Sequence, residues 1–358
     1  MNKFAEELCK RNYYEALLRG NEKKNAVYCY GFPEIKSTIL ETFRIIYEDC
    51  VPMFFYLNNI PVSRVQEVVD KMLINPFTVP STPKGCADLD EIHIPILENV
   101  REIYAKHLKG LEDYPYAYPV HGANEGILHI LCWLREAKKV RNVFIPENDY
   151  EGFYFRAQHA GLTPVFTKDM DLAPNYFILS NPSAINGNID NESIEDLLIY
   201  GHKLVIDFSY LGSTKKHVYD ITHKNIKTVI LSMSKPYGMF RYRTGFVFSR
   251  EPISNLYGNK WFKDDLRLLQ VLRVLQQHPP GSLYAKYVKW QKEIVDELSK
   301  AYDFEIYPSS SVILANKPIV SKLELPAEIA GILPKFRRGD YYRFCLSPLF
   351  EILREEGI

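Results

Sequence analysis

The 358-residue sequence lacks the features that mark membrane proteins and nucleic-acid-binding proteins. No apolar run approaches the roughly 18 residues that a membrane-spanning helix requires. Basic and acidic side chains are balanced at 44 each, so nothing indicates binding to nucleic acid or to an anionic membrane. Residues 1–8 include acidic side chains where a secretory signal would be apolar. We therefore expect a soluble, cytoplasmic protein.

The sequence also lacks clustered cysteines, internal repeats and low-complexity linkers. Its six cysteines form no Cys-x-x-Cys pair, and its nine histidines are dispersed. This distribution is typical of reduced thiols in a cytoplasm and argues against a zinc site. The length suits two domains, or one large domain with an appended lobe.

Short apolar segments alternate with helical patterns through the middle of the chain. Helices are expected at residues 127–137 and at residues 193–200, the latter after a cap at Asp190 or Asn191. The alternation predicts a mostly parallel sheet with helices on both faces. The expected strands are residues 142–145, 164–167, 176–179, 204–206, 228–231 and 245–248.

The pattern changes after Arg250. Two long amphipathic stretches, residues 261–276 and 282–302, are separated by a Pro-Pro-Gly turn. Strand-like pieces follow at residues 304–307 and 312–315. This part of the chain predicts a smaller α+β lobe.

The most informative segment is residues 231–245. It places Ser232, Ser234 and Lys235 directly after an expected strand, with Arg243 eight residues beyond the lysine. An amine in this position can hold a carbonyl cofactor as a Schiff base, while hydroxyls and a guanidinium bind a phosphate. A segment of this kind is, by itself, more often a solvated turn, so its interpretation depends on the rest of the chain.

Four other features point to the same kind of site. Asp207 ends an expected strand, and Tyr210 follows three residues later; the carboxylate could pair with a protonated ring nitrogen or merely cap the next turn. The small-residue turn 122–124 opens an expected helix, whose first N–H groups attract anions. Tyr150 could stack on a planar ring, although packing is the commoner role. Arg343, in a strand-like run, is either paired structurally or available to a carboxylate.

Together these motifs resemble the pyridoxal-phosphate (PLP) enzymes of fold type I, and within them the class I/II aminotransferases. The local likeness is to the histidinol-phosphate aminotransferase branch, over roughly residues 50–348. The resemblance implies an α/β fold of this type, with a seven-stranded-type sheet in a large domain at residues 60–255. Residues 1–59 and 256–358 would form the smaller domain. It also implies a homodimer.

The resemblance assigns a role to each of these residues. Lys235 would carry the cofactor and move protons, Asp207 would keep the pyridine nitrogen protonated, and Tyr210 would bond the ring oxygen. Tyr150 would stack on the ring, and Arg343 would bind the substrate carboxylate. The phosphate would be bound by the turn, the hydroxyls and the guanidinium, namely Gly122, Ala123, Asn124, Ser232, Ser234 and Arg243.

Two departures from the family pattern fall around the cofactor. The asparagine that usually bonds the ring oxygen aligns with Ala184, so either Asn181 or Asn186 replaces it or the oxygen loses one partner. A lost hydrogen bond to a charged group is worth about 1.5–3 kcal/mol, which would retune the cofactor without preventing its binding. The tyrosine that reaches the phosphate from the neighbouring subunit has no evident match, because no tyrosine lies between Tyr56 and Tyr104.

Three functions remain open. The first is an aminotransferase that exchanges an amino group between an amino acid and a 2-oxo acid. The second is a PLP-dependent lyase, decarboxylase or cyclase on the same fold, which the alanine at position 184 favours. The third is a non-catalytic protein of this fold, and the joint presence of Lys235, Asp207, Tyr210, Arg243 and Arg343 argues against it. The sequence does not identify the amino acid.

Overall fold

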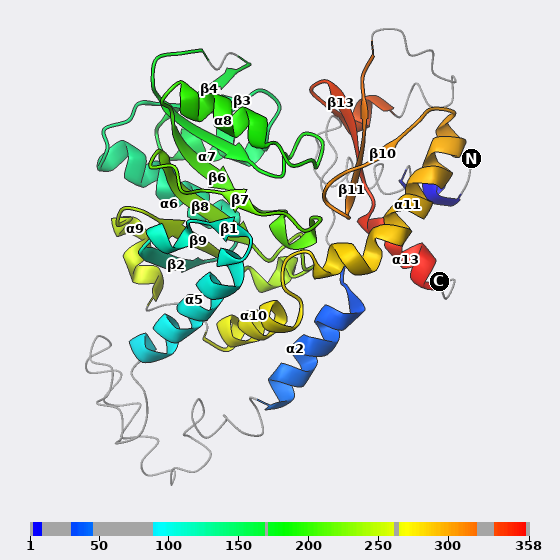
Figure 1. The fold of residues 1–358 in the computed structure, drawn as a ribbon, viewed down its shortest axis with the longest axis horizontal. Helices are drawn as coiled ribbons and strands as arrows, with labels where there is room; N and C mark the ends of the chain where they lie inside the picture. The colour runs from blue at the N-terminus through cyan, green and yellow to red at the C-terminus, as the bar shows by residue number, and fades with distance from the viewer. Residues whose placement is uncertain are drawn as a thin grey trace.

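The structure is a computed structural model, and it describes residues 3–8, 30–45, 89–168, 171–260, 265–320 and 333–355. A seven-stranded sheet with its helices forms one part of the molecule, and a four-stranded sheet with two helices forms the other (Figure 1). Among the described residues, no helix is both long and apolar enough to span a membrane.

The large sheet has the strand order β2-β9-β8-β6-β5-β3-β4. Its neighbours β4, β3, β5, β6 and β8 are parallel, whereas β9 is antiparallel to both β8 and β2. The strands are β2 (Tyr116–Val120), β3 (Asn142–Pro146), β4 (Thr163–Thr167), β5 (Tyr176–Ser180), β6 (Lys203–Asp207), β8 (Ile226–Ser232) and β9 (Gly245–Ser249). The mostly parallel sheet expected from the sequence is therefore confirmed.

Both faces of this sheet are covered, which explains why its central strands read as continuous apolar runs. Alternate side chains such as Ile178, Val205 and Ile230 pack under α6 (Ala123–Glu136) and α7 (Glu151–His159). Their neighbours along the strands, among them Leu204 and Val229, belong to a second core. That core also takes in α5 (Leu89–Ala105), α8 (Asn191–Ile199) and α10 (Asp265–Gln277). Asp190 caps α8 by accepting a hydrogen bond from the Ser193 amide at 3.1 Å.

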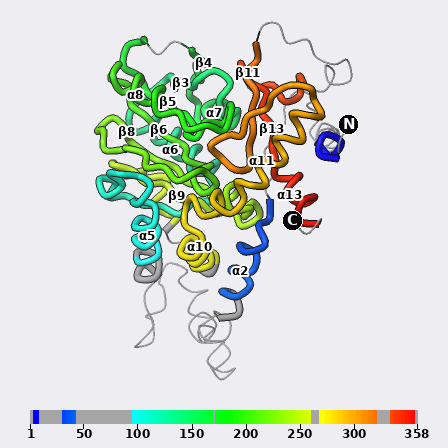
Figure 2. The backbone as a smooth tube through the Cα atoms, turned by 45° about the vertical axis from the view of Figure 1, so that its right-hand side comes forward, coloured from blue at the N-terminus to red at the C-terminus, as the bar shows by residue number. Residues whose placement is uncertain are grey.

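The four-stranded sheet has the order β10-β11-β13-β12, with antiparallel pairs throughout. Its strands are β10 (Tyr307–Pro308), β11 (Leu314–Pro318), β12 (Arg337–Arg338) and β13 (Tyr341–Cys345). The long helix α11 (Ser282–Tyr302) and the terminal α13 (Ser347–Glu355) pack beside it. Helix α10 lies between α5 and α2 (Pro33–Ile45), which brings the N-terminal segment against the large lobe (Figure 2).

The remaining elements are short. A two-stranded parallel ribbon joins β1 (Leu108–Lys109) to β7 (Tyr219–Asp220), and α9 (Ser254–Tyr257) follows β9. Short 3-10 turns lie at residues 111–113, 211–213, 240–242, 258–260 and 333–336.

The predictions for the C-terminal part were only partly correct. The helix at Ser282–Tyr302 is confirmed, whereas the strand expected at residues 304–307 is paired only at Tyr307–Pro308. Asp303 ends α11 in the left-handed conformation, with φ of 54°. The residues directly after it therefore reverse the chain direction and are not paired in the sheet. The strand expected at 312–315 begins at Leu314, because the Val312 amide is bound to the Ser213 carbonyl. The expected helix start at Trp261 lies outside the described residues.

Candidate active site

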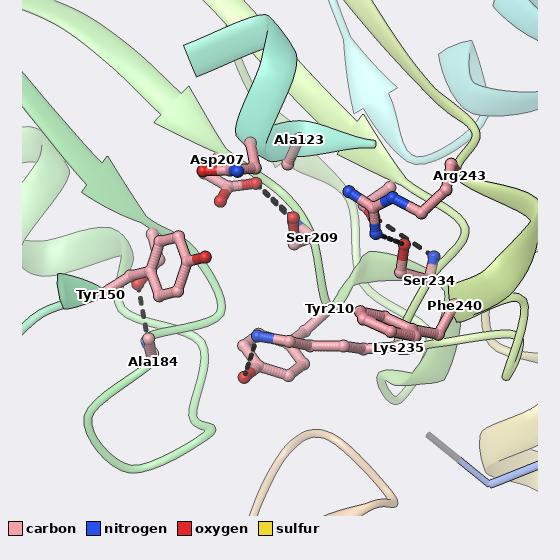
Figure 3. A pocket seen from close by; sticks show the side chains of 13 residues that line it. Ala123, Tyr150, Ala184, Asp207, Ser209, Tyr210, Ser234, Lys235, Phe240 and Arg243 are labelled. Atoms are coloured by element: carbon pink, nitrogen blue, oxygen red, sulfur yellow. Dashed lines mark hydrogen bonds between the residues drawn. The ribbon is translucent and has the colours of Figure 1, made fainter. Parts of the chain in front are cut away.

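A cavity of about 250 Å³ opens at the carboxyl ends of β5, β6 and β8 (Figure 3). This is the edge where open α/β sheets bind their ligands. Nine of the predicted site residues line it: Ala123, Asn124, Tyr150, Asp207, Tyr210, Ser232, Ser234, Lys235 and Arg243. Four further lining residues are Ser180, Ala184, Ser209 and Phe240.

Lys235 lies in the turn that follows β8, and its amine points into the cavity. The Nζ atom donates a hydrogen bond to the Tyr210 hydroxyl at 3.3 Å. It also lies 5.1 Å from the ring centroids of both Tyr150 and Tyr210, so the amine is enclosed by two aromatic side chains (Figure 3). Burial lowers the pKa of Lys235, but electrostatic interactions with Tyr210 and Tyr150 and the hydrogen bond to Tyr210 outweigh that effect and leave the pKa above its usual value.

Asp207 ends β6 and is 4% exposed. Its Oδ1 atom accepts hydrogen bonds from the amide of Ser209 at 3.0 Å and from the hydroxyl of Ser209 at 2.6 Å. Burial raises the pKa of Asp207 to about 6, although the bonds from Ser209 and the charge of Lys235 act in the opposite direction. The carboxylate is therefore oriented by one serine and lacks full compensation for its buried charge.

Arg243 and the start of α6 form the other end of the cavity. The Arg243 Nη2 atom donates to the His121 carbonyl at 2.9 Å, and Nη1 lies 3.5 Å from the Ser234 hydroxyl. Gly122 precedes the helix with φ of 78°, and a Cβ there would lie 2.9 Å from Arg243 Nη2. The backbone can approach the guanidinium this closely because residue 122 is glycine. This end offers a helix N-terminus, a serine hydroxyl and a guanidinium to an anion.

Asn124 has a second task besides lining the cavity. Its Oδ1 atom accepts a hydrogen bond from Arg156 Nε at 2.8 Å, which ties the start of α6 to α7. The side-chain oxygen of Asn124 is therefore engaged by Arg156. The backbone N–H of Asn124 remains the group that the helix N-terminus presents to an anion.

Asp149 and Ser180 form a hydrogen-bonded pair that was not predicted from the sequence; the buried Ser180 lines the cavity, and the partly buried Asp149 lies behind it. Ser180 donates its amide to Asp149 Oδ2 at 2.9 Å and its hydroxyl to Oδ1 at 2.5 Å. The Tyr150 amide donates to the same Oδ1 atom at 2.6 Å, and the Ala184 amide donates to the Ser180 hydroxyl at 2.7 Å. Burial raises the pKa of Asp149 to about 6. In the sequence, the only sign of this pair is an aspartate directly before the tyrosine that was expected to stack on the ring.

Asn181 and Asn186 are not among the residues that line the cavity. Asn181 is fully buried, it precedes a cis peptide bond to Pro182, and its Oδ1 atom accepts from the Asp190 amide at 3.0 Å. The Asn186 Oδ1 atom accepts from the Asn188 amide at 2.9 Å. Both side chains thus shape the loop, and Ala184 is the member of this segment that faces the cavity.

Arg343 lies on β13 of the smaller sheet, 7% exposed, and is not one of the cavity-lining residues. Its Nη1 atom donates to the Ala184 carbonyl, and its charge is close enough to lower the pKa of Lys235. Arg338, which was not predicted, lies nearby: burial, followed by the charge of Arg343, lowers its pKa to about 10. Arg343 thus approaches the cavity from the side of Ala184, and Arg338 lies close enough for the two charges to interact.

No family model matches the sequence. No curated protein matches it either. The structure, by contrast, is similar to several solved structures at low sequence identity.

Substrate-bound BacF from Bacillus subtilis superposes with a TM-score of 0.60 at 12% identity, covering 99% of this chain and 93% of that one. A probable N-succinyldiaminopimelate aminotransferase from Thermus thermophilus gives 0.58 at 16% identity, with coverages of 97% and 96%. A putative histidinol-phosphate aminotransferase from Erwinia carotovora gives 0.51 at 14% identity, with coverages of 73% and 87%. The chain therefore has the fold of the PLP-dependent transferases of fold type I.

Proposed function

We propose that the protein is a PLP-dependent aminotransferase that exchanges an amino group between an amino acid and a 2-oxo acid. The observation that carries the proposal is the meeting of three groups at one cavity: the Lys235 amine, the Asp207 carboxylate and the anion-binding end formed by Arg243. The names of two similar structures, both of them aminotransferases, support it.

The anion-binding end fits the phosphate of the cofactor. The start of α6, the Ser232 and Ser234 hydroxyls and Arg243 face one part of the cavity. The Ser232 hydroxyl accepts a hydrogen bond from the Ser234 amide at 3.2 Å, which keeps the two hydroxyls close together. A dianionic phosphate placed there gains charge-assisted hydrogen bonds, and the helix dipole adds to them.

The opposite part of the cavity fits the pyridine ring. Asp207 is a buried carboxylate with only partly compensated charge, and a protonated ring nitrogen would compensate it. Tyr150 supplies an aromatic surface against which the ring would stack. When bound, the cofactor supplies an electron sink for the carbanion that forms when the amino acid loses its α-proton.

The chain's own residues would handle the proton transfers. Lys235 Nζ would hold the cofactor covalently and, once released, would act as the base that moves the α-proton. The Tyr210 hydroxyl, 3.3 Å from Nζ, would orient the amine and adjust its proton affinity. Asp207 would keep a proton on the ring nitrogen, with its Oδ1 atom held by Ser209.

Arg343 would bind the α-carboxylate of the amino acid. It comes from β13 and lies beside the cavity, where its Nη1 atom donates to the carbonyl of the cavity-lining Ala184. A guanidinium binds a carboxylate with two parallel hydrogen bonds, which fixes orientation as well as affinity. The exposed side chain of Phe240, at 55%, lies at the mouth of the same cavity.

A second candidate is a lyase, decarboxylase or cyclase that uses the same cofactor. The observation that favours it is Ala184, which faces the cavity where the aminotransferases place an asparagine. Asn181 and Asn186 are bonded within the loop, so the ring oxygen would keep Tyr210 without that amide. A loss of this kind would change how strongly the ring withdraws electrons, and so the stability of the carbanion from which these alternative reactions branch.

The first experiment is the visible absorption spectrum of the purified protein, with Lys235→Ala and, as a control, the exposed Lys216→Ala. We expect a visible band that disappears on borohydride reduction, is absent in K235A and persists in K216A. A wild-type protein that stays colourless after incubation with PLP would refute the proposal.

A panel of amino acids then separates the two candidates. Formation of a 2-oxo acid together with the aminated, colourless cofactor supports transamination. Release of ammonia or carbon dioxide without the aminated cofactor supports the second candidate. We also propose a homodimer, which light scattering tests: a monomeric mass would contradict it.

A further inference from the structure

Three adjacent strands bring two carboxylates to one edge of the sheet. Strand β3 pairs with β5, and β5 pairs with β6 in a register that sets Ser180 opposite Asp207. Asp149, three residues past the end of β3, bonds both the amide and the hydroxyl of Ser180. The order across the sheet is therefore Asp149, Ser180, Asp207.

The two carboxylates act on each other. Asp207 is almost fully buried and Asp149 is partly buried, and the charge of Asp149 contributes to the raised pKa of Asp207. The other charged groups that face the pair are Lys235, which favours the ionised form of Asp207, and Asp190, whose charge acts on Asp149. The cation that acts on Asp207 is thus the same amine that would hold the cofactor.

Placing two like charges side by side away from water costs free energy unless a cation lies near them. Asp149 accepts three hydrogen bonds, two at Oδ1 and one at Oδ2; a neutral asparagine would keep the two at its oxygen with less cost of burying charge. The negative charge of Asp149 therefore needs a second explanation. The cofactor group that could carry a proton nearby is the ring nitrogen, which would lie beside Asp207.

We propose that Asp149 is a positioning residue whose negative charge, acting together with Asp207 across Ser180, favours the protonated form of the cofactor's ring nitrogen. The inference rests on the proposed cofactor. Asp149 lies outside the cavity and would not touch the ring, so it acts mainly through its electrostatic field, with Ser180 lying between the two carboxylates. Its effect should therefore appear only with a ring that carries a nitrogen.

The test measures Kd of the cofactor-free protein for two probes, PLP and its 1-deaza analogue, in which a C–H group replaces the ring nitrogen. Fluorescence titrations give the ratio of the two Kd values for wild type, Asp149→Asn and Asp207→Asn. Asp220→Asn is the matched control, since it removes an exposed carboxylate on β7. Ser180→Ala removes the bridging hydroxyl while leaving both charges in place.

We expect wild type to prefer PLP, and D149N to lower that preference about tenfold, the equivalent of one pKa unit at the ring nitrogen. D207N should lower it at least as much, while D220N leaves it unchanged and S180A keeps most of it. If D149N does not fold, Asp149→Ser, a neutral residue that can still accept a hydrogen bond, makes the same test.

A wild-type ratio in D149N would overturn the inference, and Asp149 would then serve only to hold Ser180 and Tyr150. A uniform weakening of both probes in D149N would overturn it as well, because that result indicates a structural role. Failure of the wild-type protein to bind either probe would instead refute the proposed function, and the two failures are therefore distinguishable.

Discussion

Replacing Asp207 by asparagine should stabilise the cofactor-free protein, and by an amount that depends on pH. The Oδ1 atom accepts both hydrogen bonds from Ser209, so an asparagine whose oxygen takes the same place keeps them. What the substitution removes is a buried charge. Burial raises the pKa of Asp207 from 3.8 to about 6, and that shift is a free-energy cost of holding the ionised carboxylate in the folded protein.

The size of the effect follows from the shift. A shift of about two units corresponds to about 3 kcal/mol, which is an upper estimate of the full cost above the folded-state pKa. A carboxyl with a raised folded-state pKa gains protons on folding, so the cost fades as the pH falls through 6 towards 4. The free energy of unfolding of D207N should therefore exceed that of wild type by up to about 3 kcal/mol at pH 8 and by about half of that at pH 5.

Urea denaturation of the two cofactor-free proteins between pH 5 and pH 8 provides the measurement. The lowered pKa values of His107, His217 and His278 destabilise the fold on acidification, which opposes the effect of Asp207. These histidines are present in both proteins, so their contribution cancels when the stability of wild type is subtracted from that of D207N. Asp220→Asn is the control: the pKa of Asp220 is lowered to about 2, so its contribution stays constant over this range. A difference between D207N and wild type that stays constant, or that grows on acidification, would refute the reasoning.

Three further outcomes are expected. The rate at which the cofactor-free protein takes up PLP should rise with pH, because the raised pKa of Lys235 keeps its amine protonated; a rate that falls from pH 6 to pH 8 in absorbance measurements would contradict this. Gly122→Ala should lower the free energy of unfolding by about 1–3 kcal/mol and raise Kd for PLP more than Kd for unphosphorylated pyridoxal, since its Cβ meets Arg243. Arg343→Lys should raise KM for the amino acid about tenfold or more while Kd for PLP changes little, because a lysine cannot form the two-pronged carboxylate contact.

The sheet was predictable because its chemistry is local. Strands buried on both faces are short apolar runs, and β3, β5, β6 and β8 are all of this kind. Strand β2 was not predicted: it lies at the edge of the sheet, Tyr116 is exposed and Pro119 lies within it, although its other residues are buried. The boundaries of β10 and β11 were misplaced because long-range backbone bonds, such as that from Val312 to Ser213, decide where pairing starts.

The residues of the candidate site also differ in whether local sequence or long-range contacts determine their positions. Residues next to strand ends, such as Lys235 and Asp207, stand out in the sequence because each follows a recognisable strand. The Asp149–Ser180 pair does not, because 31 residues separate its members and only the lateral order of β3, β5 and β6 brings them together. The orientation of the Asn181 and Asn186 amides was likewise open, since bonds to the loop backbone determine where they point.

Arg343 belongs to a different sheet from every predicted cofactor contact on the strand ends. Lys235, Asp207 and Arg243 adjoin strands of the seven-stranded sheet. Arg343, by contrast, belongs to the four-stranded sheet, which follows α10 and α11 in the chain. Under the proposed function, substitutions in the strands from β10 to β13 would therefore alter how the substrate carboxylate is bound, while the residues that would anchor the cofactor keep their places. Substrate binding would then be free to change without loss of the cofactor site.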